Sequence, residues 1–282
     1  MNLVEYLTRA SSYLERHGVD SPRLNAELML AHLLGISRLD VYTSFERTLS
    51  EAQDDAYRDA VVLRGTGYPL QYITGETGFR GITVKVAPGV FIPRPETEVL
   101  VEKALEVLDE SGTARVLDVG TGCGNVALSI AVERPGAVVV ATDCDPGAVA
   151  LCVENAGSCG VDDRVTVVSG DLFEPLAGQE PFDLIVSNPP YIPEGAADTL
   201  PVEVREHEPA RALFAGPEGM DVIRRITAGA PEFLKPGGWL VLEVDESHAR
   251  KVVTEMEDAG WLDAEVFEDL AGRERIVRAR RA

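Results

Sequence analysis

The chain has 282 residues, of which 45% are hydrophobic and 26% are charged, a composition typical of a globular protein that buries a full core. Its formal net charge of −21 disfavours nucleic-acid-binding proteins, because Lys and Arg must displace counterions from phosphates and an acidic surface repels a polyanion. Such a surface suits a basic protein partner better. The length allows one large domain or two smaller ones.

The sequence contains no pattern typical of a metal site, a signal peptide or a membrane span. Its four cysteines form no paired C-x-x-C pattern and its four histidines are scattered, so no metal is expected. The first residues include Glu5 and no apolar core of a signal peptide. No run approaches the ~18 apolar residues of a membrane span. We therefore expect a cytoplasmic protein that binds neither metal nor membrane.

Residues 1–75 are predicted to form a helical bundle, because apolar residues recur there at helical spacing. Ser21 followed by Pro22 indicates an N-cap with proline in the first turn of the second helix. Ser50 and Gln53 have the spacing of a capping box at the start of a later helix. No chemistry is evident in this bundle, which we interpret as a domain for recognition or support.

A β-hairpin is predicted to link the bundle to a second domain. Residues 76–95 are rich in Gly and Pro, and residues 82–86 alternate in strand fashion. An amphipathic helix that extends to Leu108 follows. The hairpin therefore separates the bundle from a second domain that covers residues 96–282.

Residues 96–282 alternate between strand-like and helix-like patterns, which predicts parallel strands joined by right-handed crossovers. The last two strands, 264–268 and 275–279, are joined by a short turn and must therefore be antiparallel. A mostly parallel sheet that ends in an antiparallel hairpin is the architecture of a class I methyltransferase, a Rossmann-like α/β fold. The earlier strands are predicted at 116–119, 138–142, 165–168, 184–187 and 239–244.

A glycine-rich turn follows the first of these strands and consists of Gly120, Thr121, Gly122, Cys123 and Gly124. Glycine lets the backbone turn sharply and approach a ligand closely. In the dinucleotide fingerprint G-x-G-x-x-G the third glycine comes one residue later, where this chain has Asn125. The turn also lacks a basic residue for phosphates. A zwitterionic ligand such as S-adenosylmethionine (AdoMet) therefore fits better than a dinucleotide.

Acidic residues lie at the ends of three predicted strands, where ligands of open α/β sheets bind. Asp143 comes 23 positions after Gly120, where a carboxylate can accept both hydroxyl groups of a ribose. Asp171 can accept from the adenine amino group while the Leu172 N–H reaches a ring nitrogen. Asp118 either receives the ligand's ammonium group or caps the glycine turn. Alone, Asp143 would more often be an ordinary surface residue.

The turn Asn188-Pro189-Pro190-Tyr191 directly follows the strand that contains residues 184–187. Two prolines in a row make a stiff loop that presents carbonyl groups, because proline has a fixed φ and no N–H. The Asn188 carboxamide and the Tyr191 ring add an acceptor and a flat aromatic face. Such a site suits a planar NH2 group, either an amide or the exocyclic amine of a base. The alternative is a purely structural turn, since such dipeptides are common in loops.

With these motifs assembled, the chain resembles the peptide chain release factor N(5)-glutamine methyltransferases, the PrmC or HemK family, over nearly its full length. The most specific motif is Ile-Pro-Arg-Pro-Glu-Thr-Glu at residues 92–98, whereas the Asn-Pro-Pro-Tyr turn also occurs in DNA adenine and some rRNA methyltransferases. The other segments that carry the resemblance are 20–27, 69–73, 120–124, 208–209, 212–213 and 269–273.

The resemblance implies that AdoMet is held by Gly120–Gly124 and Asp143 and leaves as S-adenosylhomocysteine. It implies that the substrate is the glutamine of the Gly-Gly-Gln loop of bacterial class I release factors. The side-chain amide of this glutamine would bind to Asn188–Tyr191, and Asn188 would border the cofactor as well. The bundle would recognise the release factor, and we expect a monomer that does not bind nucleic acid directly.

The chain departs from the family pattern in one place. After the fifth strand the family usually has Glu, any residue, Gly and, three positions later, Gln. Here Glu243 is followed by Val244 and Asp245, and the later position is His248. This departure concerns the local structure behind the site and not the reaction.

An amide nitrogen is a poor nucleophile because its lone pair is delocalised into the carbonyl. We expect Asn188 Oδ1 and the Pro189 carbonyl to accept the two amide hydrogens. This aligns the nitrogen with the sulfonium methyl and favours the charge that develops on it. Tyr191 would pack against the amide plane, which makes these three the predicted catalytic residues.

Other functions remain as alternatives. A ribosomal-protein glutamine methyltransferase is one, although that sister family differs at residues 92–98. A nucleic-acid amino methyltransferase of the N6-adenine type shares the turn and cofactor but conflicts with the charge of −21. A non-enzymatic AdoMet-binding scaffold conflicts with the intact Asn-Pro-Pro-Tyr turn, and an oxidoreductase conflicts with the glycine spacing.

Overall fold

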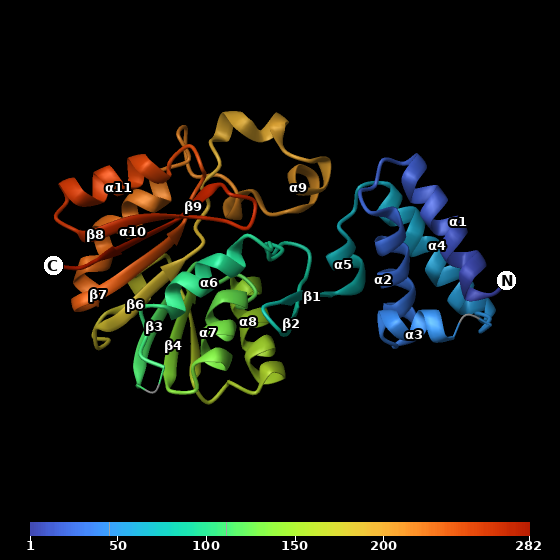
Figure 1. The fold of residues 1–282 in the computed structure, drawn as a ribbon, viewed down its shortest axis with the longest axis horizontal. Helices are drawn as coiled ribbons and strands as arrows, with labels where there is room; N and C mark the ends of the chain where they lie inside the picture. The colour runs from blue at the N-terminus through green and yellow to red at the C-terminus, as the bar shows by residue number, and fades with distance from the viewer. Residues whose placement is uncertain (45, 111) are drawn as a thin grey trace. The chain divides into compact units, whose positions relative to one another are not determined.

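The computed structural model describes residues 1–44, 46–110 and 112–282, whose path is shown in Figure 1. The chain divides into two compact units. The helical unit consists of Met1–Glu76 and Pro201–His207, and the sheet unit consists of Thr77–Leu200 and Glu208–Ala282. Among the described residues, no helix combines the length and the apolar character needed to cross a membrane.

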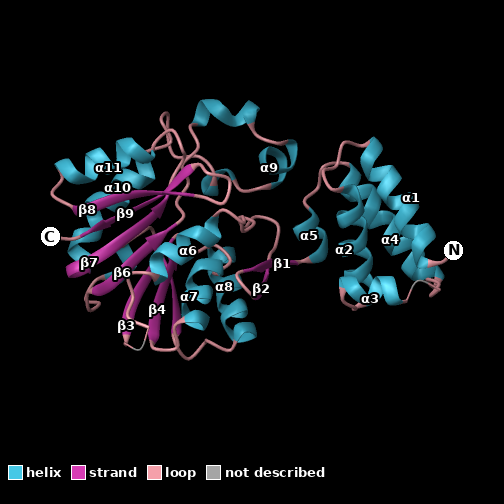
Figure 2. Ribbon diagram, viewed as in Figure 1, coloured by secondary structure: helices cyan, strands magenta, loops and turns pink. Residues whose placement is uncertain are grey.

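The helical unit is a bundle of α1 (Leu3–Arg16), α2 (Pro22–Leu34), α3 (Arg38–Thr43), α4 (Glu51–Gly65), α5 (Leu70–Thr74) and α9 (Val202–His207), drawn in cyan in Figure 2. Leu7, Leu30 and Tyr57 belong to its buried core. The predicted capping box at the start of α4 is confirmed. The Ser50 N–H donates to the Gln53 side chain at 3.1 Å, and the Gln53 N–H donates to Ser50 Oγ at 3.3 Å.

The predicted N-cap is confirmed in position, since Ser21 is the N-cap residue of α2 and Pro22 lies in its first turn, but Ser21 does not cap through its side chain. Helix α2 does begin at Pro22, but Ser21 has φ +48° and its side chain makes no cap hydrogen bond. Instead, the Asn25 side chain donates to the carbonyls of Asp20 at 3.0 Å and Ser21 at 3.2 Å. The Ser-Pro pair therefore locates the start of the helix, while the stabilising side chain comes from inside its first turn.

Helix α9 packs within the helical unit although it follows α5 by more than a hundred residues. The side chain of Arg64 is 9% exposed and forms an ion pair with Glu203 at 2.9 Å. The rings of Tyr68 and His207 meet edge to face with their centroids 5.0 Å apart. No sequence pattern indicates that this segment leaves the region 96–282, because its contacts are tertiary.

In the hairpin region, β1 (Glu76–Phe79) and β2 (Ile82–Lys85) pair as a two-stranded sheet. The side chain of Asn155 accepts from the Lys85 N–H at 2.8 Å and donates to the Lys85 carbonyl at 3.0 Å. Because Asn155 is buried, this pair of bonds fixes β2 to the body of the sheet unit.

The main strands are β3 (Ala114–Val119), β4 (Ala137–Asp143), β5 (Val165–Ser169), β6 (Phe182–Ser187), β7 (Leu234–Glu243), β8 (Leu262–Glu268) and β9 (Glu274–Arg280). They form a seven-stranded sheet in the order β5-β4-β3-β6-β7-β9-β8. Strands β3 to β7 are parallel, whereas β9 runs antiparallel to β7 and β8. This confirms the predicted class I methyltransferase architecture. Strand β7 begins before the predicted residue 239 because Leu234 already pairs with Phe182.

The helices of the sheet unit are α6 (Thr97–Leu105), α7 (Asn125–Glu133), α8 (Pro146–Cys159), α10 (Asp221–Phe233) and α11 (Ala249–Asp258). Figures 1 and 2 show α6, α7 and α8 on one face of the sheet and α10 and α11 on the other. Leu117 and Leu240 pack with Ile223 and Val252 in one buried cluster on the second face. The carboxyl ends of the parallel strands therefore meet at one edge of a rigid sandwich.

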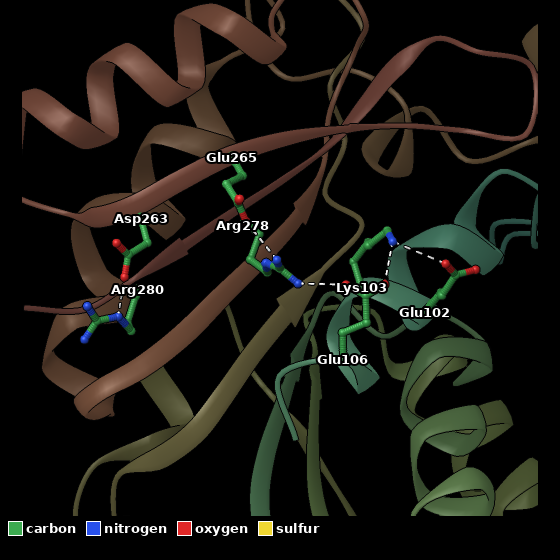
Figure 3. Close-up of polar contacts among 7 residues, drawn as sticks. All are labelled: Glu102, Lys103, Glu106, Asp263, Glu265, Arg278 and Arg280. Carbon is green, nitrogen blue, oxygen red and sulfur yellow. Dashed lines mark hydrogen bonds and ion pairs between the residues drawn. The ribbon is translucent and has the colours of Figure 1, made fainter. Parts of the chain in front are cut away.

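Ion pairs around Arg278 connect the antiparallel end of the sheet to the end of α6, as drawn in Figure 3. The Arg278 side chain is 13% exposed and pairs with Glu106 at 3.0 Å and Glu265 at 2.8 Å. Its guanidinium carbon also lies 4.6 Å from the centroid of the Phe267 ring and 5.3 Å from that of the Trp239 ring. Two charge pairs and two aromatic contacts thus converge on a side chain that water hardly reaches.

We expect Arg278→Ala to lower the free energy of unfolding by about 1–2 kcal/mol, because it removes these four contacts together. Arg280→Ala is the matched control, since Arg280 is 35% exposed and pairs with Asp263 at 2.6 Å. It should cost less than about 1 kcal/mol. Urea unfolding followed by tryptophan fluorescence measures both, because Trp239 and Trp261 lie in the sheet unit. If both substitutions lowered the free energy of unfolding equally, the stabilising role assigned to Arg278 would be contradicted.

Candidate active site

A cavity of about 200 Å³ lies at the carboxyl ends of β3, β4, β5 and β6. The predicted site residues that line it are Gly120, Thr121, Gly122, Asp143, Asp171, Leu172, Asn188, Pro189, Pro190 and Tyr191. Asp118 lines it as well. Residues from four separate strand ends therefore share one cavity, as expected for ligands of open α/β sheets. Within the described ranges, no group of three or more His, Cys, Asp or Glu side chains is placed to hold a metal.

The glycine turn serves two different purposes. Gly120 and Gly122 have φ of +73° and +57°, and a Cβ added to either would meet no atom within 4 Å. Their missing side chains thus leave open space on the cavity side. Gly124 has φ +90°, and a Cβ there would come within 2.7 Å of Cys152 Sγ. Gly124 therefore permits close packing of the turn against α8.

Cys123 and Gly124 lie outside the cavity lining, although both were predicted to hold the cofactor. The Cys123 side chain is 1% exposed, and burial raises the pKa of its thiol to about 12. Its backbone carbonyl accepts from the Asn155 side chain at 2.8 Å. Cys123 thus supports the turn from the core side, because residues 120–122 line the cavity whereas the Cys123 side chain is buried.

These roles predict different consequences for two glycine substitutions. Gly124→Ala should lower the free energy of unfolding by about 2–3 kcal/mol, because the new methyl group overlaps Cys152 and strains the backbone. Gly122→Ala should cost about 1–2 kcal/mol, since it only adds strain. Its main effect should be a loss of ligand affinity, because the methyl group enters the cavity. Urea unfolding measures the stability of both variants, and ligand titration measures their affinity. A larger loss of stability in Gly122→Ala than in Gly124→Ala would contradict the roles assigned to the two glycines.

Asp118 caps the glycine turn, which was one of its two predicted roles. Its side chain is 1% exposed, and Oδ2 accepts from Thr121 Oγ1 at 2.6 Å and from the Ala127 N–H at 3.1 Å. Burial raises the pKa of Asp118 to about 7, and the charge of Asp143 adds to the rise. The two hydrogen bonds stabilise the ionised form but do not outweigh burial. A cation bound in the cavity would stabilise the ionised carboxylate and outweigh the effect of burial.

Asp143 is held by backbone groups on both of its oxygens. Oδ2 accepts from the Gly122 N–H and Oδ1 accepts from the Asp145 N–H, each at 2.9 Å. A carboxylate oxygen has two lone-pair positions, so each oxygen retains acceptor capacity. The carboxylate is therefore fixed in orientation and is still able to receive two hydroxyl groups.

Asp171 and Leu172 follow β5 and line the same cavity. Asp171 forms an ion pair with Arg225 of α10 at 2.6 Å, and Arg225 itself lines the cavity. Sequence reasoning missed this arginine, because nothing in a helix pattern shows which strand end it faces. Leu172 has φ +48°, a left-handed value that is unusual for this residue type. Such strain is most often maintained at functional sites.

The Asn-Pro-Pro-Tyr turn is fixed from behind. Ser187 Oγ donates to the Val119 carbonyl at 2.6 Å, which joins the ends of β6 and β3. Asn188 Nδ2 donates to Thr97 Oγ1 at 3.1 Å, and the Tyr191 hydroxyl donates to Glu243 Oε1 at 3.1 Å. The Asn188 carboxamide therefore turns its nitrogen away from the solvent and toward buried Thr97.

Phe91 also lines the cavity and was missed by sequence reasoning. The guanidinium carbon of Arg94 lies 4.9 Å from the centroid of its ring, and Arg94 forms an ion pair with buried Glu208. All three residues belong to or adjoin motifs that carry the family resemblance. The motifs were therefore the available signal, but they do not show which side chain reaches the cavity.

The chain matches two family models and many curated proteins. Residues 5–75 match the PrmC N-terminal domain, and residues 81–206 match the methyltransferase small domain. A release factor glutamine methyltransferase from Deinococcus radiodurans is 44% identical over 282 residues, which is 100% of this chain and 99% of that protein. The protein of the same name from Geobacter sulfurreducens is 43% identical, over 95% of this chain and 93% of its own length.

Solved structures show the same fold at lower identity. A T. thermophilus 16S rRNA methyltransferase in complex with AdoMet and guanosine has a TM-score of 0.55 at 22% identity, over 73% of this chain and 50% of that one. A methyltransferase from Pyrococcus furiosus has a TM-score of 0.53 at 17% identity, over 72% of this chain and 90% of its own. These likenesses establish the methyltransferase fold of the sheet unit.

Proposed function

The chain belongs to the release factor glutamine methyltransferase family, and we propose that it methylates the glutamine of the Gly-Gly-Gln motif in bacterial class I release factors. The methyl group of AdoMet is transferred to the side-chain amide nitrogen. The observation that carries the proposal is 44% identity to such an enzyme over the whole chain. The Asn-Pro-Pro-Tyr turn and the glycine turn line one cavity, as this reaction requires.

The cavity lining fits AdoMet. The carboxylates of Asp118, Asp143 and Asp171 suit a ligand that carries an ammonium and a sulfonium group, and the turn 120–124 has no cation for a phosphate. Asp118 would hold the ammonium group, Asp143 the ribose hydroxyls, and Asp171 with the Leu172 N–H the adenine edge. Bound there, AdoMet supplies an electrophilic methyl group on sulfur.

Asn188 and Pro189 bind and orient the glutamine. Asn188 Oδ1 and the Pro189 carbonyl accept the two amide hydrogens, which fixes the nitrogen in line with the methyl group. The same acceptors stabilise the positive charge that develops on nitrogen during transfer. Tyr191 packs against the amide plane, and the surplus proton leaves to water afterwards.

The helical unit is the part of the chain that we assign to release-factor recognition, since it matches the PrmC N-terminal domain and carries no evident chemistry. The enzyme acts as a monomer in this proposal. It works in the cytoplasm, where release factors are available, and it does not bind nucleic acid directly. A net charge of −21 supports the last point.

Labelled AdoMet tests the substrate class. The enzyme is incubated with a class I release factor, with a mixture of ribosomal proteins, with DNA and with rRNA, in parallel. Label in the release factor alone is the expected result. Label in DNA or rRNA would favour the amino methyltransferase alternative, and label in a ribosomal protein would favour the sister activity.

The raised pKa of Asp118 predicts a pH-dependent affinity for AdoMet. The ammonium group needs the ionised carboxylate, so a proton competes with it below pH ~7. The dissociation constant should therefore rise up to about 10-fold per pH unit as the pH falls below 7. Calorimetric titrations between pH ~5.5 and ~8.5 measure this. Asp118→Asn should bind AdoMet more weakly and without this dependence; a wild-type affinity that is constant with pH would contradict the assignment.

The raised pKa of Asp118 also affects the stability of the folded protein. The resulting pH dependence is opposite in sign to that of an ordinary paired carboxylate. The folded-state pKa of about 7 exceeds the reference value of 3.8. The folded protein therefore binds more protons than the unfolded chain between these values, and ionisation of Asp118 lowers stability as pH rises through them. Bound AdoMet should offset this loss above pH ~7.

A further inference from the structure

The turn between β8 and β9 contains the motif at residues 269–273, yet none of the described residues that line the cavity belongs to it. The Asp269 side chain is fully buried, and its Oδ1 accepts from the Ala271 N–H at 2.8 Å and from the Arg273 N–H at 3.0 Å. Asp269 therefore uses one carboxylate oxygen to close the turn. The other oxygen, Oδ2, faces the guanidinium group of Arg275.

Arg275 connects this turn to the Asn-Pro-Pro-Tyr turn. It lies near the start of β9 with its side chain 15% exposed, and its Nε forms an ion pair with Asp269 Oδ2 at 3.4 Å. From the same guanidinium group, Nη1 donates to the Tyr191 hydroxyl at 3.3 Å. The guanidinium carbon lies 5.9 Å from the centroid of the Tyr191 ring. Two motifs that are far apart in the sequence are thus joined through one side chain.

The hydrogen bonds at the Tyr191 hydroxyl have fixed directions. A guanidinium group only donates, so Arg275 occupies a lone pair of the hydroxyl oxygen. The single hydroxyl hydrogen is donated to Glu243 Oε1 at 3.1 Å. Arg275 and Glu243 lie on β9 and β7, which pair in the main sheet, and the Val244 N–H donates to the Arg275 carbonyl at 2.8 Å. The hydroxyl is therefore held by one donor and one acceptor that belong to the same rigid sheet.

The backbone end of Tyr191 is fixed as well. The N–H of the next residue, Ile192, donates to the Leu213 carbonyl at 2.9 Å, and the Ala215 N–H donates to the Ile192 carbonyl at 3.0 Å. A Cβ added to Gly219 would come within 2.2 Å of the Tyr191 carbonyl oxygen, so the backbone packs closely there. With the backbone and the hydroxyl both held, the direction in which the Tyr191 ring extends is determined.

We propose that Arg275, anchored by Asp269, is a positioning residue that holds the Tyr191 ring against the plane of the substrate amide. The inference rests on the proposed function, in which Tyr191 packs against that plane. The hydroxyl lies at the far end of the ring from the backbone, so a hydroxyl that Arg275 no longer holds lets the ring swing away from the amide. Arg275 itself is not part of the cavity lining. The motif at residues 269–273 thus serves the reaction from outside the cavity.

Arg275→Met tests this role, because methionine keeps much of the length of the side chain without its charge or its donors. We expect kcat to fall about 10-fold through misplacement of the ring, while the dissociation constant of AdoMet changes less than about 2-fold. Arg273→Met is the matched control, since Arg273 is exposed on the same turn and loses the same charge. It should retain the wild-type kcat. An undiminished kcat in Arg275→Met, or an equal loss of AdoMet affinity, would overturn the proposal.

A double-mutant cycle with Tyr191→Phe separates positioning from general support of the fold. Phenylalanine lacks the hydroxyl through which Arg275 acts, so replacing Arg275 as well should have little further effect. The double variant should have a kcat within about 2-fold of that of Tyr191→Phe alone, because residues that act through one contact are not additive. A further loss of about 10-fold in the double variant would show that Arg275 acts by another route, and would overturn the proposal.

Two conservative changes test the two contacts of Arg275. Arg275→Lys keeps the charge and a donor for Tyr191, and it should recover part of the rate that Arg275→Met loses. Asp269→Asn keeps an oxygen for the turn but removes the charge that faces Arg275, so it should lower kcat in the wild-type background and not in Arg275→Met. A lysine variant as slow as the methionine variant, or an equal effect of Asp269→Asn in both backgrounds, would contradict the positioning role.

A measurement on the free enzyme tests the contact without turnover. In protein labelled with 13C at the tyrosine Cζ, the Tyr191 signal is identified by its absence in Tyr191→Phe. This carbon bears the hydroxyl, so its chemical shift should change in Arg275→Met and stay constant in Arg273→Met. An unchanged signal in Arg275→Met would overturn the inference. If wild-type enzyme methylated no release factor, the proposed function would fail, while this measurement would still decide whether Arg275 holds Tyr191.

Discussion

Asn188→Ala is expected to lower kcat for glutamine methylation by about 10²–10³-fold, while AdoMet binds with nearly unchanged affinity. The alanine removes the acceptor that orients the amide nitrogen and stabilises its developing charge, and loss of one such group in an active site typically has an effect of this size. Single-turnover assays with a release factor measure the rate. Calorimetric titration with AdoMet measures the binding.

Two results would separate this account from its alternatives. A kcat within a few-fold of the wild-type value would show that the Asn-Pro-Pro-Tyr turn is structural. A large loss of AdoMet affinity in Asn188→Ala would mean that Asn188 serves the cofactor more than the glutamine. Asn188→Asp is a useful companion, because it retains an acceptor and should lose less activity than the alanine variant.

Asp143→Ala is expected to raise the dissociation constant of AdoMet by about 10²-fold or more. Each hydroxyl donated to a carboxylate contributes about 1.5–3 kcal/mol, and the fixed Asp143 carboxylate is placed to accept two. The substitution also frees the Gly122 N–H, which donates to Asp143 at 2.9 Å, and so loosens the glycine turn. Calorimetric titration measures the loss directly.

Asp163→Ala is the matched control for this experiment. Asp163 is exposed and precedes β5, at the edge of the sheet opposite to the cavity. Its replacement removes the same charge and should leave the dissociation constant within about 2-fold, because exposed charges are screened at this distance. Equal affinities of the Asp143→Ala and wild-type proteins would contradict the assignment of the ribose site.

The fold of the sheet unit was predictable because its signals are local. Strands β3 to β6 are short apolar runs bounded by turns, and their alternation with helices determines a parallel sheet. The acids at the strand ends then share one edge by topology alone, which is why Asp143 and Asp171 could be assigned together. Asp118 illustrates the limit of this reasoning, since both of its possible roles were consistent with its position.

Contacts between distant segments could not be predicted. The packing of α9 in the helical unit depends on Arg64, and nothing in residues 201–207 distinguishes them from a loop. The relation of Thr97 to Asn188 spans 91 residues and appears only after α6 has been placed beside β6. Patterns of hydrophobicity determine elements and their order, whereas the partners of buried polar groups depend on side-chain geometry.

The segment after Glu243, where the chain departs from the family pattern, forms a turn that the Asp245 side chain stabilises. Asp245 Oδ1 accepts from the Ser247 N–H at 3.0 Å and from the Ser247 hydroxyl, and these bonds lower the pKa of Asp245 although burial acts against them. The side chain thus closes the turn that leads to α11. Glu243 accepts a hydrogen bond from Tyr191, so the differences from the family pattern at Asp245 and His248 do not remove this contact behind the Asn-Pro-Pro-Tyr turn.

Mass spectrometry of the methylated product tests the central claim most directly. The enzyme is incubated with AdoMet and a class I release factor, and the peptide that contains Gly-Gly-Gln is fragmented to locate any added methyl group. We predict one methyl group on the side-chain amide nitrogen of that glutamine, and none in a release factor whose glutamine is replaced by alanine. A release factor that stays unmodified, or a methyl group on any other residue, would contradict the account.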